Sequence, residues 1–397
     1  MNRSVWIIIV VALLFRILLI FATPLYDQPA LIPYFNDEPA HYNYVSYLAK
    51  YGRLPVQTSS SQDGFDEYKF EYYQAPLYYL LVSPFKAIGE KLTPSWEHIW
   101  VRLVSVLFSL AGLIVLFRTV QSFCEKRRAA IYLLLLAAFA GIPLRFGALV
   151  TNDSLLFLIA CLYFSLILQV MNSKCDKRLL SMGILTVAAG LWTKVSFIVM
   201  VPVLPLVLWK KPTCSRPKAT AALILPLMVI LPWYFRNYLL YQRFIPIEVG
   251  FGGVDPVTPQ TALWRIFYTA DYFVRSFVFP YDQLWGGFLD HPTYIFVATL
   301  MILLVIFGLK KLRNDQLEWF WVFMLAIGLN LGGYLLLNVS RFQAEARLLI
   351  PALPFILYLF AAGIEKMMGE RQKSAYVLLA LWIVLPWVSG LAGKLIM

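Results

Sequence analysis

The chain has 397 residues, of which 60% are hydrophobic and only 14% are charged, with a mean hydropathy of +0.69. Soluble domains carry about 25% charged residues, so this composition excludes a soluble globular protein. The apolar residues come in blocks of about 20, each long enough to cross a hydrocarbon core of about 30 Å. These runs are continuous rather than alternating, which excludes a transmembrane β-barrel. We therefore expect an all-α polytopic membrane protein that forms one domain over residues 1–397, without a soluble domain.

About 11 segments are predicted to span the membrane. They are 4–23, 99–121, 129–149, 152–171, 178–193, 195–209, 219–239, 293–309, 317–338, 348–364 and 374–394. The first is longer than the 7–15-residue apolar core of a secretory signal, so we expect it to be a membrane helix. Arg16 lies within it. A buried arginine in a membrane must face protein or a cavity, and a structural role is expected here.

The distribution of Lys and Arg predicts the orientation. Short alternate loops hold 17 of the 34 Lys and Arg residues, and all of these loops fall on one side of the predicted bundle. The positive-inside rule makes that side cytoplasmic, so the N-terminus is inside and the C-terminus outside. Much of the net charge of +12 is then an orientation signal, and nucleic acid is not an expected partner. Two large loops, 24–98 and 240–292, are predicted to be external. The first is rich in Tyr and Pro and is too long for a mere connector, so we expect it to be functional.

The first external loop contains the stretch Asn36-Asp37-Glu38-Pro39-Ala40-His41. Proline suits the first turn of a helix, so the two acids should lie at the positive end of a short helix. Adjacent carboxylates cannot both face one way, and we assign Asp37 as a general base with Glu38 and His41 in support. The alternative is a capped helix with solvated acids and an interfacial histidine. One histidine with two acids is a weak metal signature, so a divalent metal is compatible but not indicated.

Further candidate residues gather on the same predicted side, mostly at helix ends. They are Lys69, Gln74, Asn152, Asp153, Lys194, Arg236, Arg341 and Arg347. Each also has a structural interpretation: a helix cap at 152–153, a snorkelling Lys194, an aromatic belt around Arg236, or an ion pair of Arg347. Because external loops should be poor in cations, their clustering favours an anionic substrate. Arginine can bind a phosphate bidentately, so a lipid with a phosphate headgroup fits.

Several motifs occur in one order and on one predicted side. They are Asp37-Glu38, Pro76-Leu77-Tyr78-Tyr79, Thr151-Asn152-Asp153-Ser154, Leu191-Trp192-Thr193-Lys194, Trp233-Tyr234-Phe235-Arg236-Asn237, and Ala346-Arg347 to Pro354. Together they resemble the GT-C superfamily of membrane glycosyltransferases over residues 1–365. The nearest branches are similar to the protein O-mannosyltransferases and the lipid A aminoarabinose transferases. A related group of bacterial membrane proteins of undefined function is at least as similar.

The resemblance implies inverting transfer of a sugar from a polyprenyl-phosphate donor to an acceptor glycan, lipid or protein. The protein would lie in the lipid bilayer, and the reaction would occur at the external, periplasmic face of the bacterial plasma (inner) membrane. Asp37 matches the catalytic aspartate, and no cofactor is required because the donor is already activated. The chain departs from the aminoarabinose branch at Gln74, where that branch has a lysine; Lys69 lies five residues earlier. This departure shifts the expected phosphate contacts to Lys194 and Arg347.

Two alternatives to an enzyme stay open. One is a transporter or flippase of lipid-linked sugars, and the other is a non-catalytic partner subunit with a GT-C-like fold. Transporters tend to have internal repeats and charged or broken helices at mid-bilayer. Here the charged residues are predicted to lie at one surface, which favours the enzyme.

Overall fold

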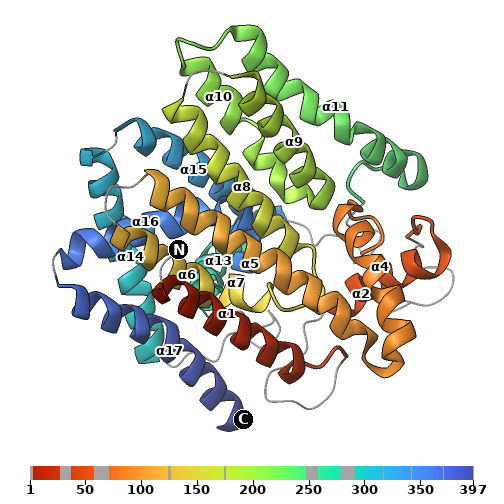
Figure 1. Cartoon of the computed structure of the whole chain (residues 1–397), viewed down its shortest axis with the longest axis horizontal. Helices are drawn as coiled ribbons and strands as arrows, with labels where there is room; N and C mark the ends of the chain where they lie inside the picture. Colours follow the sequence, from red (N-terminus) through yellow and green to blue (C-terminus); the bar gives the residue numbers. More distant parts are fainter. Residues whose placement is uncertain are drawn as a thin grey trace.

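A computed structural model describes most of the chain, and every element it describes is helical (Figure 1). The described residues are 3–26, 37–57, 71–123, 127–173, 176–246, 258–278, 291–315, 317–340, 342–369 and 371–396. Lys69 and Arg341 lie outside them. The longer helices are α1 (Arg3–Ala22), α5 (Glu97–Phe123), α8 (Asp153–Asn172), α9 (Lys177–Thr193), α11 (Arg216–Tyr241), α13 (Pro259–Val278), α14 (His291–Asp315), α15 (Leu317–Ser340) and α17 (Gln372–Ile396). The shorter ones are α2 (Glu38–Tyr51), α4 (Leu77–Leu92), η1 (Pro94–Trp96), α6 (Arg127–Phe139), α7 (Gly141–Arg145), η2 (Val195–Met200), α10 (Val203–Lys210), η4 (Ala346–Ala352) and α16 (Leu353–Met368).

Eight helical segments of the described part are long and apolar enough to cross a membrane. All eight coincide with predicted spans, so the expectation of an all-α polytopic membrane protein is confirmed. The expected number of 11 is not confirmed. The other three predicted spans correspond to the 17-residue α9 and to two interrupted segments, α6 with α7 and η2 with α10.

The interruption after α6 explains the arginine in α1. Ala140 leaves the helical conformation, and a buried turn follows. The Arg16 side chain donates to the backbone carbonyls of Ala138 and Pro143 at 3.1 and 3.0 Å, and to the Ser109 hydroxyl at 3.0 Å. Helix breaks in a membrane need such partners because no water satisfies the freed backbone groups. The contacts of Arg16 agree with the structural role expected for it.

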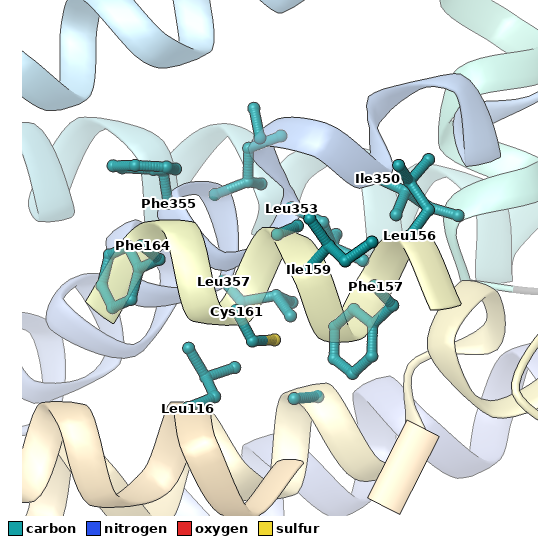
Figure 2. Close-up of a cluster of buried hydrophobic side chains, with 14 of the residues drawn as sticks. Leu116, Leu156, Phe157, Ile159, Cys161, Phe164, Ile350, Leu353, Phe355 and Leu357 are labelled. Atoms are coloured by element: carbon teal, nitrogen blue, oxygen red, sulfur yellow. The ribbon is translucent and has the colours of Figure 1, made fainter. Parts of the chain in front are cut away.

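Helix α8 lies in the centre of the bundle and is enclosed by apolar side chains. Figure 2 shows its side chains, among them Phe157 and Phe164, between Leu116 of α5 and residues of η4 and α16 such as Leu353. The rings of Phe164 and Phe355 meet edge to face with centroids 4.9 Å apart. This packing fixes the position of the N-terminus of α8.

The short helices α2 and α4 lie at one end of the bundle, at the right of Figure 1. The C-terminal end of α11 is hydrogen-bonded to the segment between α2 and α4. Arg236 donates to the carbonyl of Pro55 at 2.6 Å, and Asn237 donates to the carbonyl of Tyr73 at 3.2 Å. The Tyr241 hydroxyl accepts a hydrogen bond from the Gln57 amide at 2.7 Å. The segment between α2 and α4 is therefore attached to α11 on both sides of residues 58–70.

Candidate active site

Glu38 is completely buried and connects α2 to α5. Its two oxygens each lie 2.7 Å from a nitrogen of Arg102, Nε and Nη2, and one of them also accepts from the Val150 amide at 2.7 Å. The remaining Arg102 nitrogen donates to the carbonyls of Ile20 and Thr23. Such a bidentate pair is geometrically specific. Glu38 therefore fixes the position of the start of α2, and in this way it also fixes the position of the adjacent Asp37.

Asp37 precedes α2 and faces a different set of groups. Its carboxylate pairs with Arg347 of η4, and both side chains keep limited exposure, 17% and 15%. Burial opposes ionisation of Asp37, but the Arg347 guanidinium, aided by the positive charge of Lys194, outweighs it and holds the pKa of Asp37 below its usual range. Asp37 is thus an ionised, partly accessible carboxylate next to the N-terminus of α2.

Arg347 lies at the start of η4 and contacts three acids. Besides Asp37, its guanidinium lies 2.5 Å from Glu345 and 3.7 Å from Asp153, and it packs 5.6 Å from the ring centre of Phe146. Glu345 has an extended backbone and the helical residues of η4 begin directly after it, so the chain changes direction at this point. This turn directs Arg347 toward the start of α2.

Asp153 and Lys194 form a buried ion pair beside this group. Lys194 follows the last residue of α9, and its ammonium lies 2.6 Å from the fully buried Asp153 carboxylate at the start of α8. The acid is at a helix N-terminus and the cation at a helix C-terminus, so both helix dipoles stabilise the pair. The predicted residues Asp37, Asp153, Lys194 and Arg347 are therefore brought together where four helical segments begin or end.

An amide network extends the group toward the first loop. Asn152 donates to the Gln74 side-chain oxygen and to the carbonyl of Thr193, and Gln74 donates to Glu71. Glu71 is buried, and burial together with the negative charge of Asp37 raises its pKa to about 8. We did not predict Glu71 from the sequence. The available signal was an acid three residues before Gln74 in a tyrosine-rich stretch.

His41 is buried one turn into α2 and contacts a tyrosine. Its Nδ1 lies 2.7 Å from the Tyr79 hydroxyl, and the Tyr79 ring stacks on Tyr44 at 3.8 Å. Burial lowers the pKa of His41 to about 3, so the imidazole is neutral at physiological pH. Its contacts indicate that it positions Tyr79.

Arg236 does not join the group of acids and cations. Its guanidinium binds the loop at Pro55 and lies 4.7 Å from the ring centre of Trp233. Lys69 and Arg341 lie outside the described residues, so their predicted role stays a prediction. Within the described ranges, no group of three or more His, Cys, Asp and Glu residues is arranged to hold a metal ion.

Comparisons with known proteins agree with the resemblance inferred from the motifs. Residues 74–235, less than half of the chain, match the family model of dolichyl-phosphate-mannose-protein mannosyltransferases. No curated protein matches the sequence.

Two related folds occur among solved structures. ArnT from Cupriavidus metallidurans bound to undecaprenyl phosphate superposes with a TM-score of 0.61 at 13% identity, over 96% of this chain and 64% of ArnT. AglB, an archaeal oligosaccharyltransferase from Archaeoglobus fulgidus, in complex with an inhibitory peptide and a dolichol-phosphate, gives 0.56 at 9% identity, over 98% of this chain and 56% of AglB. The chain thus spans about six tenths of the length of these proteins. In fold, this membrane protein resembles ArnT and AglB, and its residues 74–235 match the mannosyltransferase family model.

Proposed function

We propose that this protein transfers a sugar from a polyprenyl-phosphate donor to an acceptor hydroxyl, with Asp37 as the general base. One observation carries the proposal: the Asp37 carboxylate is kept ionised and partly accessible beside Arg347, next to a second cation. The neighbours bound to undecaprenyl phosphate and to dolichol-phosphate support a donor of this class.

The reaction follows from the charges of this group. The acceptor hydroxyl gives its proton to Asp37 as its oxygen attacks the anomeric carbon. The bond from that carbon to the phosphate oxygen breaks on the opposite face, which inverts the configuration. Lys194 and Arg347 stabilise the charge of the departing phosphate, because preorganised cations in a partly dry site act strongly on developing charge.

The loop charges support a location at the external face of a bacterial plasma membrane. In the orientation that the positive-inside rule favours, Asp37 and the start of α8 face outward. A donor with a long prenyl chain would lie in the bilayer and bring its phosphate to the helix ends. The acceptor would approach from the external side.

The test measures donor use in a bilayer. Protein in nanodiscs is supplied with undecaprenyl-phosphate-linked hexoses and envelope extract as the acceptor source, and released undecaprenyl phosphate is measured by mass spectrometry. Arg347→Lys keeps the positive charge among the acids but removes bidentate binding, so we expect the donor KM to rise about tenfold or more. Arg53→Ala, in an exposed residue near the end of α2, is the control and should leave KM unchanged.

Two results would contradict the proposal. An unchanged donor KM in Arg347→Lys would remove Arg347 from the phosphate site. Donor binding by the wild type without any release of undecaprenyl phosphate would favour a flippase or a non-catalytic subunit.

A further inference from the structure

The site described above has more acids than cations. Four carboxyl groups lie against two cations in the described part of the chain: Asp37, Glu71, Asp153 and Glu345 against Lys194 and Arg347. Both cations already have carboxylate partners. With all four acids ionised, the group would be doubly negative and would repel a phosphate. Protonation of one acid halves this net negative charge and so weakens the repulsion of an anionic donor.

Glu71 differs from the other three acids in its partners. Asp37, Asp153 and Glu345 all pair with Lys194 or Arg347. The hydrogen bond that the structure gives to the Glu71 carboxyl comes instead from the Gln74 amide. Glu71 is also 3% exposed. The Gln74 amide, Lys194 and Arg347 favour the ionised form of this carboxyl, but burial and the negative charge of Asp37 outweigh them.

The groups around Glu71 come from several elements. Asp37 precedes α2, Tyr79 belongs to α4, Lys194 follows α9 and Arg347 lies in η4. The two cations are shared with the other acids. Burial, together with the negative charge of Asp37, raises the pKa of Glu71 to about 8. At neutral pH the proton of this group therefore resides on Glu71.

We propose that Glu71 is a protonated positioning residue, and that the site binds the donor phosphate more tightly while this carboxyl is neutral. This inference rests on the proposed function. Gln74 connects Glu71 to this site through hydrogen bonds. It donates to Glu71 and accepts from Asn152, and Asn152 also donates to the backbone carbonyl of Thr193, just before Lys194. The network places the neutral carboxyl beside the ion pairs. Donor binding is then linked to pH through one proton.

The inference also explains the glutamine at position 74. A lysine there would donate to Glu71 and hold it ionised, and the pair would be neutral overall. A protonated Glu71 with Gln74 is neutral overall as well. The two arrangements carry the same net charge into the site, but only the glutamine version makes that charge depend on pH.

The first experiment measures the binding of undecaprenyl phosphate to the full chain in detergent between about pH 6.5 and 9.5. Above pH 8, we expect the wild-type Kd to rise about tenfold per pH unit. Glu71→Gln, which mimics the protonated acid, should show a smaller rise, limited to the ionisation of the lipid phosphate that all variants share. Glu90→Gln is the matched control: Glu90 is an exposed acid of α4, and its variant should keep the wild-type profile.

The outcomes separate the two proposals. Binding by the wild type with the same profile as Glu71→Gln would overturn this inference and leave the proposed function standing. Failure of undecaprenyl phosphate to bind at any pH would contradict both.

A second measurement does not depend on the lipid. Infrared spectra at pH 7 should contain the C=O band of a protonated carboxyl, and this band should be missing from Glu71→Gln. In Gln74→Lys the band should also be lost, and donor binding should no longer weaken above pH 8. Absence of the band from the wild type, or its persistence in Glu71→Gln, would overturn the inference.

Discussion

Asp37 and Glu38 are adjacent carboxylates, and the structure predicts opposite consequences for their removal. Glu38 is fully buried and accepts three hydrogen bonds of 2.7 Å, two of them from Arg102. Glu38→Gln leaves the arginine charge buried without a counter-ion, which should lower the free energy of unfolding by about 3–5 kcal/mol. Typical folding stabilities are about 5–15 kcal/mol, so this is a large loss.

Asp37→Asn should have little effect on stability and a large effect on activity. Arg347 keeps Glu345 and Asp153 as counter-ions and the substitution conserves the shape of the side chain, so the loss of stability should be much smaller than in Glu38→Gln. Loss of a general base should reduce turnover about 10²- to 10⁴-fold. The two variants together separate the position of α2 from the chemistry of the site.

Unfolding would be followed by circular dichroism as SDS is added to mixed micelles, and turnover by release of undecaprenyl phosphate. The double variant Glu38→Leu/Arg102→Met removes both buried charges and should regain most of the lost stability. The reasoning would be refuted if Glu38→Gln were as stable as the wild type. It would also be refuted if Asp37→Asn retained near-normal turnover.

Two further predictions concern packing and pH. In Gly308→Ala, the new Cβ would overlap the backbone carbonyl of Leu359, so α14 and α16 must separate, at a cost of about 1–3 kcal/mol; Gly328→Ala, whose Cβ would meet nothing within 4 Å, should be neutral in the same SDS titration. Burial lowers the pKa of His41 from 6.5 to about 3, so the stability that depends on its neutral form is complete above pH 6.5 and is lost as pH falls toward 3. His41→Gln should flatten this part of the stability profile, and an identical slope in both proteins would contradict the assignment.

The membrane helices follow from local sequence. Residues 152–171 were predicted to form a span, and the structure has a helix at Asp153–Asn172. Length and hydropathy suffice because a membrane segment must satisfy its backbone internally, which makes a long apolar run helical whatever packs beside it. The break after Phe139 was not predicted, since the apolar run continues through it. Its partner Arg16 lies 122 residues from Ala138 in the chain.

For the site as well, the sequence predicted part of the arrangement and the rest depends on contacts between distant residues. Hydropathy and loop charge placed Asp37, Asp153, Lys194 and Arg347 on one side of the membrane, and the structure brings these four together. Their pairing could not be read from the sequence: Arg347 meets Asp37 across 310 residues. The different surroundings of Asp37 and Glu38, and the place of Glu71 beside them, also depend on the fold.

The physical reason is the range over which each effect acts. Partition of a segment into the bilayer and its helical conformation depend on residues that are neighbours in sequence, so composition and spacing reveal them. Ion pairing and proton affinity depend on which groups the packed helices bring within a few ångströms and on how far water is excluded. Those conditions exist only once α2, α8, α9 and η4 have met, and they decide which acids pair with Arg347 and Lys194.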